Sequence, residues 1–250
     1  MSETNAPIIT FLTDFGLSDG YVAEMKAAVL RDCPSARLVD VTHLIAPQDV
    51  LAGSIALERA VRSFPAGTVH VAVVDPGVGS DRKLIVASVN GQTIFAPDNG
   101  LITWPFRLHA DVATHELLWR PAETPSLTFH GRDIIAPAAA LQASGSFDPA
   151  WLGRMDRPVL LDVDIARSLA DARVLHIDHY GNVTTNVPAA MVSLTTRIKG
   201  VGAVGQTYAD VPPGRALGLI GSSGLLEIAI RNGSAADRLG LQVGQNLHVY

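Results

Sequence analysis

The first half of the chain alternates short runs of apolar or β-branched residues with longer amphipathic segments. The short runs have the length of buried strands, and the longer segments space their apolar residues as a helix requires. They follow one another as strand, helix, strand, helix and strand over residues 8–12, 20–33, 37–42, 48–64 and 68–73. This order predicts an α/β domain with a mostly parallel central sheet and helices packed on its faces.

Two further elements are expected in this half of the chain. The runs 84–89 and 92–96 flank an Asn-Gly dipeptide, which predicts a β-hairpin closed by a tight turn. Residues 132–144 predict a last helix, in which Pro137 comes early enough to kink the helix rather than abolish it.

The second half of the chain has a different pattern. Its apolar runs are short and are separated by Gly, Asn and Asp, which predicts a small all-β domain. The expected strands cover residues 159–163, 173–177, 216–220, 225–230 and 247–250, and only 188–192 has a helical pattern. We therefore expect two domains, an α/β domain over 1–157 and a β domain over 158–250.

The composition limits the classes of function. Of the 250 residues, 48% are hydrophobic and 17% charged, so the chain can bury a substantial core. The net charge of −5 gives no basic footprint for nucleic acid, and the single Cys33 excludes a disulfide framework and a cysteine metal cluster. No apolar run is long enough to span a membrane, and the opening MSETNAP lacks the features of a signal peptide. We expect a soluble, cytoplasmic protein.

A glycine-rich loop, VDPGVGSDRK at residues 74–83, follows the third expected strand. Its spacing fits neither a Walker loop nor a dinucleotide-binding fingerprint, since Arg82 stands where the fingerprint needs its third glycine. The loop instead joins two strands and places Asp75 and Arg82 at one end of a sheet. On this pattern alone, the two side chains form either a salt bridge that braces the loop or part of a site.

Other polar positions also have two interpretations. Asp14 lies just past the carboxyl end of the first strand, where open α/β sheets bind ligands and a carboxylate can accept two ribose hydroxyl protons, although it could also cap a turn. His130 precedes the last helix of the first domain, and such a histidine is more often a capping or packed residue than a catalyst. In 178–186 and 221–224, turn chemistry by itself explains the Asp, Asn and Gly residues.

A metal site is an alternative that the histidines raise. His176, Asp178 and His179 could form one, as could His109 and His115. The H-x-x-H spacing on a strand, however, directs the two imidazoles to opposite faces and argues against joint coordination. We therefore expect no metal.

Taken together and in order, these motifs resemble those of the S-adenosylmethionine (SAM) hydroxide adenosyltransferases, or adenosine-forming SAM hydrolases, which are related to the fluorinase and chlorinase. The similarity extends from about Ile8 to the C-terminus. Its six segments are TDFG at 13–16, VDPGVGS at 74–80, APDNG at 96–100, FHGRDIIAPAAA at 129–140, DHYGN at 178–182 and GSSGLLEIA at 221–229. The resemblance implies an enzyme with a C-terminal β-barrel that acts on SAM without a cofactor.

The resemblance also implies a reaction, in which water or hydroxide attacks the ribose 5′ carbon of SAM and gives adenosine and methionine. The family's Asp–Arg–His set falls here on Asp75, Arg82 and His130. Because the sulfonium makes methionine a neutral leaving group, the difficulty lies in activating the water. Arg82 would favour its hydroxide form, and either Asp75 or His130 would accept the proton.

The remaining contacts with SAM are assigned by the same resemblance. Asp14 would bind the ribose hydroxyl groups. Residues of the second domain would hold adenosine and the methionine end, namely Asp178, Asn182, Ser222, Ser223, Glu227, Arg231 and Asn232. Family members are trimers with sites between one subunit's α/β domain and its neighbour's β domain, so we expect a homotrimer.

Two other functions stay open at this point. A halogenase-like adenosyltransferase would transfer the same adenosyl group to halide, but the halogenating relatives carry a tyrosine where Asp75 stands and lack the Arg–His pair. A non-catalytic module would bind SAM or adenosine and leave it unchanged. Incubation with SAM distinguishes the three functions by their products.

Overall fold

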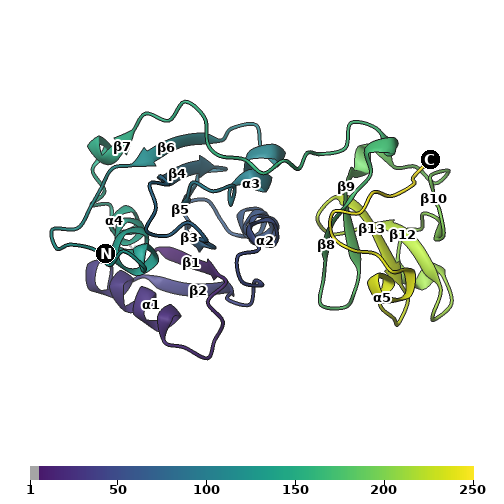
Figure 1. Cartoon of the computed structure of the whole chain (residues 1–250), viewed down its shortest axis with the longest axis horizontal. Coiled ribbons are helices and arrows are strands. Elements are labelled where there is room, and N and C mark those ends of the chain that lie inside the picture. Colours follow the sequence, from purple (N-terminus) through teal and green to yellow (C-terminus); the bar gives the residue numbers. More distant parts are fainter. Residues whose placement is uncertain (1–5) are drawn as a thin grey trace, which may run out of the picture. The chain divides into compact units, whose positions relative to one another are not determined.

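The computed structural model describes residues 6–250 and contains two compact units. The first unit ends at Asp162, and the second covers Val163–Tyr250 (Figure 1). Residues 1–5, which carry most of the segment considered for a signal peptide, lie outside the described residues. Within residues 6–250, no helix is both long and apolar enough to cross a membrane.

The first unit is built on a seven-stranded mixed sheet with the order β2-β1-β3-β5-β4-β6-β7. Its strands are β1 (Ile8–Thr13), β2 (Arg37–Thr42), β3 (Val69–Val73), β4 (Leu84–Val89), β5 (Gln92–Pro97), β6 (Ala113–Leu117) and β7 (Leu152–Gly153). The pairs β1–β2, β1–β3 and β3–β5 are parallel, whereas β4–β5, β4–β6 and β6–β7 are antiparallel. The sheet is therefore mixed rather than mostly parallel as expected, and the predicted parallel strands form one side of it.

Helices cover both faces of this sheet (Figure 1). They are α1 (Tyr21–Asp32), α2 (Val50–Ser63), α3 (Thr103–Leu108), the π-helical turn η1 (Gly131–Ile135) and α4 (Ala136–Ser144). In the central strand β3, Val71 and Val73 belong to the hydrophobic cluster that includes α1 and α4, and Ala72 belongs to the cluster that includes α2. Because side chains alternate along a strand, β3 contributes to the core on both faces.

Most of the elements expected in the first unit are confirmed. The hairpin β4–β5 is closed by Asn90 and Gly91, whose φ angles of 50° and 70° suit the tight turn of a two-residue hairpin. The expected last helix is divided into η1 and α4, and Pro137 lies in the first turn of α4, directly after the π-helical turn. Three short elements, α3, β6 and β7, were not expected.

The second unit contains a four-stranded antiparallel sheet with the order β12-β13-β9-β8 and a short antiparallel pair, β10–β11. Their bounds are β8 (Val174–Ile177), β9 (Val183–Pro188), β10 (Arg197–Ile198), β11 (Gly202–Ala203), β12 (Ala216–Ile220) and β13 (Leu225–Ile230), and one helix, α5 (Ala235–Leu239), follows. Short 3-10 turns, among them η5 (Tyr208–Asp210), connect the strands. The smaller all-β unit is therefore confirmed as a separate sheet domain.

Two expectations in this region are wrong, and a third is met only by a short 3-10 turn. Residues 159–163 form no strand, because the Val159 N–H donates to Asp98 Oδ1 at 2.8 Å and the Leu161 N–H donates to Thr103 Oγ1 at 2.9 Å, both side-chain acceptors. Residues 247–250 also form no regular strand, and Val249 makes only an isolated bridge to Ile198. The segment expected to be helical, 188–192, contains a 3-10 turn at Ala189–Met191.

Candidate active site

The candidate site of the first unit lies where the parallel strands end, the edge at which open α/β sheets bind ligands. The loop 74–83 leaves the end of β3 and returns at the start of β4, and both ends are fixed to the turn that follows β5. The Asn99 Nδ2 donates to the Val74 carbonyl at 2.8 Å, and the Asp98 N–H donates to the Lys83 carbonyl at 3.0 Å. The loop therefore has a fixed position at this edge of the sheet.

Two glycines bring this loop and the segment around His130 close to their neighbours. Gly79 has a φ of 80°, and a Cβ built there would lie 2.6 Å from the carbonyl oxygen of Leu127. Gly131 begins η1 and lies against α1, since its added Cβ would be 3.4 Å from Met25 Sδ. His130 thus directly precedes a π-helical turn, a feature that is frequent at functional sites.

Asp75, Arg82 and His130 are in direct contact. The Arg82 Nε lies 2.9 Å from both Asp75 Oδ1 and Asp75 Oδ2, and the Arg82 Nη2 also donates to Oδ2. The same Nη2 lies 3.0 Å from His130 Nδ1. The side chains of Arg82 and Asp75 are only 10% and 5% exposed. The guanidinium therefore joins a carboxylate and an imidazole from two loops, as residue spacing alone could not have shown.

This contact fixes the protonation of His130. A guanidinium has only N–H donors, so Nδ1 must accept through its lone pair, and the proton of the neutral ring is on Nε2. Burial lowers the pKa of His130, the charge of Arg82 lowers it further, and Asp75 partly opposes both effects. The imidazole is consequently neutral near pH 7.

Asp14 lies on the loop after β1, as the sequence predicts. Its Oδ2 accepts the Gln48 N–H at 2.8 Å, and Gln48 has a φ of 68°, a left-handed conformation that few residues other than glycine adopt. Gln48 has no counterpart among the expected site residues, because a backbone donor of this kind leaves no signal in the sequence. Its backbone fixes one oxygen of the Asp14 carboxylate.

A chain of polar side chains, buried at Thr13 and His43 and exposed at Asp40, supports the end of β1. The Thr13 Oγ1 lies 2.8 Å from His43 Nδ1, His43 Nε2 lies 3.0 Å from Asp40 Oδ1, and Lys26 Nζ donates to Asp40 Oδ2 at 2.7 Å. Burial raises the pKa of Asp40, but the hydrogen bonds from Lys26 and His43 outweigh burial and hold this pKa below its ordinary value. The chain fixes the residue that directly precedes Asp14.

In the second unit, Asp178 organises the turn between β8 and β9. Its Oδ1 accepts the N–H groups of Tyr180 and Asn182, each at 2.9 Å, and its Oδ2 accepts from Asn182 Nδ2 at 3.1 Å. Gly181 has a φ of 80°, and an added Cβ would lie 2.1 Å from Ser234 Oγ. The carboxylate therefore performs the turn-forming role that the residue types predict, and this role is compatible with a further contact to a ligand.

Glu227 lies on β13 and is nearly buried, and its Oε1 accepts the hydroxyl proton of Tyr208 at 2.7 Å. This hydrogen bond, together with burial and the negative charges of Glu227 and Asp178, raises the pKa of Tyr208 to about 12. Tyr208 is thus near two of the expected site residues, and no sequence pattern identifies it. Ser222 and Ser223 lie in the turn between β12 and β13, with Ser222 exposed.

Arg231 and Asn232 follow the end of β13. The Arg231 Nη1 donates to the carbonyl groups of Val211 at 2.9 Å and Ala209 at 3.3 Å, which fixes this arginine to the η5 segment. Asn232 has a φ of 58°, as expected of a turn. The described parts of the chain, residues 6–250, contain no group of three or more His, Cys, Asp or Glu residues that could hold a metal ion.

Comparison with known proteins gives consistent similarities. The SAM hydroxide adenosyltransferase N-terminal domain matches residues 9–153, and the C-terminal domain of the same name matches residues 172–248. The chain is 38% identical to the (R)-S-adenosyl-L-methionine hydrolase of Salinispora arenicola over 98% of both chains, and 40% identical to that of Salinispora tropica over 97% of both. The fluorinase of Nocardia brasiliensis is 30% identical over 75% of this chain and 74% of the relative.

A solved structure has the same fold. The crystal structure of an uncharacterized conserved protein from Thermotoga maritima matches this chain with a TM-score of 0.88 at 36% identity. The match covers 97% of this chain and 100% of that one.

Proposed function

Because the chain belongs to the SAM hydroxide adenosyltransferase family, we propose that it hydrolyses S-adenosyl-L-methionine to adenosine and L-methionine. The family membership expected from the sequence is thereby confirmed. The observation that carries the proposed chemistry is the hydrogen-bonded group of Asp75, Arg82 and His130 at the end of the parallel strands. A mostly buried carboxylate, cation and imidazole in contact can position a water molecule and take up its proton.

In the proposed step, the water oxygen forms a bond to the ribose 5′ carbon as the bond from that carbon to sulfur breaks. The bonding electrons go to sulfur, which leaves as the neutral thioether of methionine. The water loses one proton to a base of the enzyme, and that proton is later released to solvent. Since the leaving group needs no proton, the reaction requires no general acid and, in this proposal, no cofactor.

We propose that Asp75 accepts this proton and that Arg82 and His130 position the water. This assignment is supported by which of the two side chains has a vacant lone pair to accept a proton. The His130 Nδ1 is occupied by the Arg82 Nη2, and its Nε2 carries the proton of the neutral ring, so the imidazole has no vacant lone pair in this arrangement. Each oxygen of a carboxylate has two lone pairs, and Asp75 Oδ1 is within hydrogen-bond distance only of Arg82 among the described residues.

The remaining contacts are part of the proposal. Asp14, fixed by the Gln48 N–H, would accept hydrogen bonds from the ribose hydroxyl groups through its other oxygen. The residues expected from the second domain, which are Asp178, Asn182, Ser222, Ser223, Glu227, Arg231 and Asn232, would hold adenosine and the methionine end. Tyr208 joins them because it contacts Glu227.

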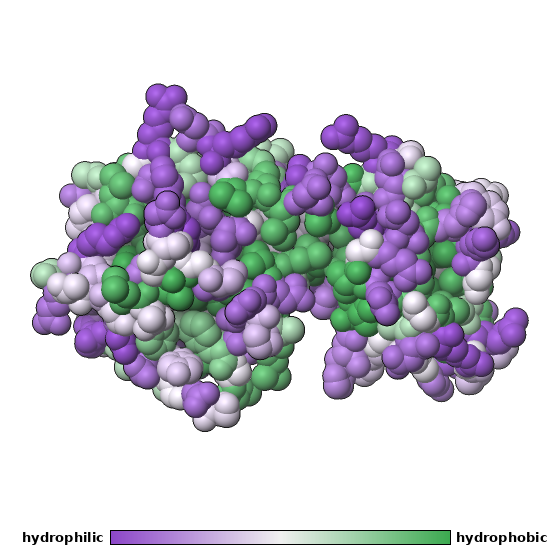
Figure 2. Space-filling model, in the orientation of Figure 1, coloured by the Kyte–Doolittle hydropathy of each residue, from purple (hydrophilic) through white to green (hydrophobic). Residues whose placement is uncertain are grey.

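We further propose a homotrimer in which each site combines the first domain of one subunit with the second domain of a neighbour. Large exposed side chains adjoin site residues in both units: Leu17 is 68% exposed near Asp14, and Tyr180 is 75% exposed beside Asp178. The viewed surfaces also display green hydrophobic areas among hydrophilic ones (Figure 2). A neighbouring subunit would cover such side chains. The barrel-like closure of the second domain, the domain limits at residues 157 and 158 and the cytoplasmic location stay predictions.

Incubation of the full chain with SAM, with and without fluoride or chloride, tests the proposal by chromatography of the products. Adenosine and methionine in equal amounts, formed at a rate independent of halide, are expected. A halogenated adenosine would instead assign the halogenase function. Unchanged SAM that nevertheless binds the protein would identify a binding module.

A further inference from the structure

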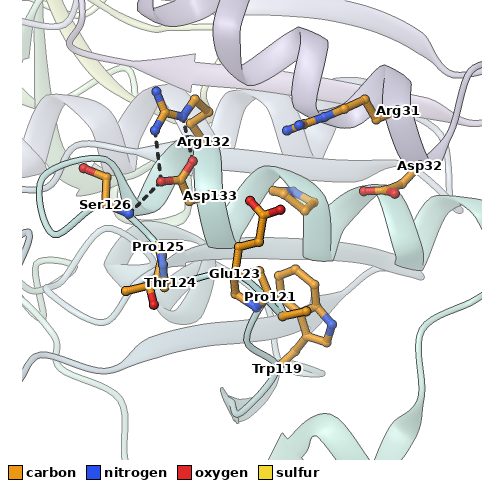
Figure 3. A pocket seen from close by; sticks show the side chains of 12 residues that line it. Arg31, Asp32, Trp119, Pro121, Glu123, Thr124, Pro125, Ser126, Arg132 and Asp133 are labelled. Carbon is orange, nitrogen blue, oxygen red and sulfur yellow. Dashed lines mark hydrogen bonds and ion pairs between the residues drawn. The ribbon is translucent and has the colours of Figure 1, made fainter.

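A cavity of about 650 Å³ lies in the first unit among the end of α1, the segment between β6 and η1, and the start of α4 (Figure 3). None of Asp14, Asp75, Arg82 and His130 lines it. The volume is in the range of small-molecule sites. The proposed hydrolysis of SAM makes no use of this cavity.

Part of the charge around the cavity is already paired. The Arg132 Nε and Nη2 donate to the two carboxylate oxygens of Asp133 at 2.6 and 3.0 Å, and the Arg132 Nη1 donates to Glu24 at 2.7 Å. Asp133 also accepts the Ser126 N–H at 2.8 Å (Figure 3). These groups form a hydrogen-bonded polar wall with an excess of negative charge, because one guanidinium meets two carboxylates.

Two other charged groups of the lining, Arg31 and Glu123, are exposed to solvent, and the charge of Arg31 also contributes to lowering the pKa of Asp133. Within residues 6–250, neither Arg31 nor Glu123 makes a hydrogen bond or an ion pair. Figure 3 shows the Arg31 guanidinium extending from α1 and the Glu123 carboxylate extending from the loop into the same space. Asp32 adds a second carboxylate on the side of Arg31. One cation and one carboxylate thus face a common cavity without neutralising each other.

The remaining lining is apolar and stiff. The Trp119 ring is half-buried and packs edge-on against Trp151, with ring centroids 6.2 Å apart. Pro121, Pro125 and Pro137 add rigid apolar surface. An aromatic face surrounded by prolines suits an apolar group of moderate size.

We propose that this cavity binds a zwitterionic α-amino acid with an apolar side chain. Its carboxylate would pair with Arg31 in the forked geometry that guanidinium favours, and its ammonium group would pair with Glu123. Its side chain would lie against Trp119. Phosphorylated ligands and nucleic acids fit poorly, because Glu123 and Asp32 would repel them.

The probe for this proposal is L-phenylalanine, which is neither substrate nor product of the proposed hydrolysis. For a ligand of this size we expect a dissociation constant on the order of millimolar. Nuclear magnetic resonance of the ¹⁵N-labelled full chain can measure binding in this range, and the indole N–H of Trp119, assigned with Trp119→Phe, reports it directly. Saturable shifts of this signal are expected.

Two analogues of L-phenylalanine test whether its carboxylate pairs with Arg31 and its ammonium group with Glu123. Phenethylamine lacks the carboxylate, and 3-phenylpropionate lacks the ammonium group. Arg31→Ala should weaken L-phenylalanine and 3-phenylpropionate about tenfold or more and leave phenethylamine nearly unchanged. Glu123→Gln should weaken L-phenylalanine and phenethylamine and spare 3-phenylpropionate. Arg59→Ala, which removes an exposed helical arginine outside the cavity, is the matched control and should change none of the three.

The proposal is overturned if L-phenylalanine leaves the Trp119 signal unchanged at ten times the expected dissociation constant. It is equally overturned if both analogues bind as tightly as the amino acid, or if Arg31→Ala and Arg59→Ala behave alike. Because these readouts measure binding, a failure here is distinguishable from a failure of SAM hydrolysis.

Discussion

At the scale of single residues, Arg82 determines the arrangement of the candidate site. It contacts both oxygens of Asp75 and also His130, so the positions of the carboxylate and the imidazole depend on one guanidinium. The alternative that Arg82 only braces an exposed loop fits poorly, since the Asp75 side chain is 5% exposed. Removing one partner of a buried pair costs about 3–5 kcal/mol, far more than the loss of a surface salt bridge.

The first prediction therefore concerns Arg82→Lys and Arg82→Ala. Lysine keeps the charge beside Asp75 but cannot contact a carboxylate and an imidazole through one planar fork, so single-turnover hydrolysis should slow by roughly 10²-fold or more. The melting temperature of this variant should fall much less than that of Arg82→Ala, which leaves Asp75 unpaired. Near-normal turnover in Arg82→Lys would return Arg82 to a purely structural role.

The second prediction is a pH dependence. The pKa of His130 is lowered by burial and by Arg82, so its folded value lies below the ordinary 6.5. Protonation of Nδ1 would set its N–H against the Arg82 N–H and break the contact. Turnover should stay constant from neutral pH down to about 6.5 and decline only below that value. Stability should depend on pH in the same direction. The contribution of His130 to the free energy of unfolding is fully present above the pKa that His130 has in the unfolded chain, and it is lost as the pH falls through the lower pKa of the folded protein.

Two variants test this assignment in pH profiles of the single-turnover rate. His130→Ala should lower the rate by roughly 10²-fold, because the water loses a group that positions it, and should remove the His130 component of the acidic limb. His248→Ala, which removes an exposed histidine of the second unit, should keep the wild-type profile. A wild-type acidic limb that persists unchanged in His130→Ala would assign the titration to another group.

Some of these site residues could be predicted from the sequence, and others could not. Asp75 and Arg82 share one short loop, so their pairing follows from the loop itself, but 48 positions separate Arg82 from His130. Only the resemblance to a family placed His130 with them. Gln48 and Tyr208 were missed, because one acts through a backbone N–H and the other is an isolated tyrosine in a polar segment.

At the scale of elements, long periodic segments were predicted well and short ones poorly. The helix α3 has six residues and includes Pro105, and the Trp104 N–H donates to Ser54 Oγ at 2.8 Å, a partner far away in sequence. The polar residues of β9, among them Thr184 and Thr185, are typical of a turn in the sequence. In the structure both threonines are buried, and the Thr185 hydroxyl donates to the Leu226 carbonyl at 2.8 Å. Tertiary partners, rather than local pattern, form both elements.

The third prediction concerns Gly79, where the loop passes close to the backbone of Leu127. Gly79→Ala places a Cβ at a φ of 80° and 2.6 Å from the Leu127 carbonyl oxygen, so the loop must move away from the segment that carries His130. Gly67→Ala is the matched control, because its φ is 83° but nothing lies within 4 Å. Both variants should lose roughly 1–2 kcal/mol of unfolding free energy from the left-handed backbone.

Of the two variants, only Gly79→Ala should lose more unfolding free energy than the left-handed backbone accounts for, and only Gly79→Ala should lose most of its turnover. Chemical denaturation and single-turnover kinetics measure the two effects. Equal losses of stability in the two variants, with turnover retained in both, would mean that the close approach at Gly79 does not position the site.

At the scale of the whole molecule, the chain consists of two compact units that each contribute expected SAM contacts. The mixed sheet of the first unit carries Asp75, Arg82 and His130, and the smaller sheet of the second unit carries Asp178 and Glu227. The change of hydrophobic pattern along the chain predicted this division into two units. Of the antiparallel part of the first sheet, the hairpin β4–β5 follows from the sequence, whereas the pairs β4–β6 and β6–β7 do not, since strand direction there depends on which neighbours pair.

The fourth prediction follows from the proposal that the sites are shared between subunits of a trimer. His130→Ala and Asp178→Ala, each purified alone, should have little activity. Mixed trimers obtained by coexpression should recover part of the wild-type rate, because some sites would combine an intact first domain with an intact second domain. Light scattering should give a trimer. A trimer without recovery, or an active monomer, would contradict the shared site.

The most direct measurement of the central claim uses oxygen-18-labelled water. If water activated at Asp75 and Arg82 attacks the ribose 5′ carbon of SAM, a single turnover in labelled water should place one heavy oxygen in the 5′-hydroxyl group of adenosine and none in methionine. Mass spectrometry of the two products reads this directly, and Arg82→Lys should give the same labelling at a much lower rate. Unlabelled adenosine, label in methionine, or no adenosine at all would contradict the account.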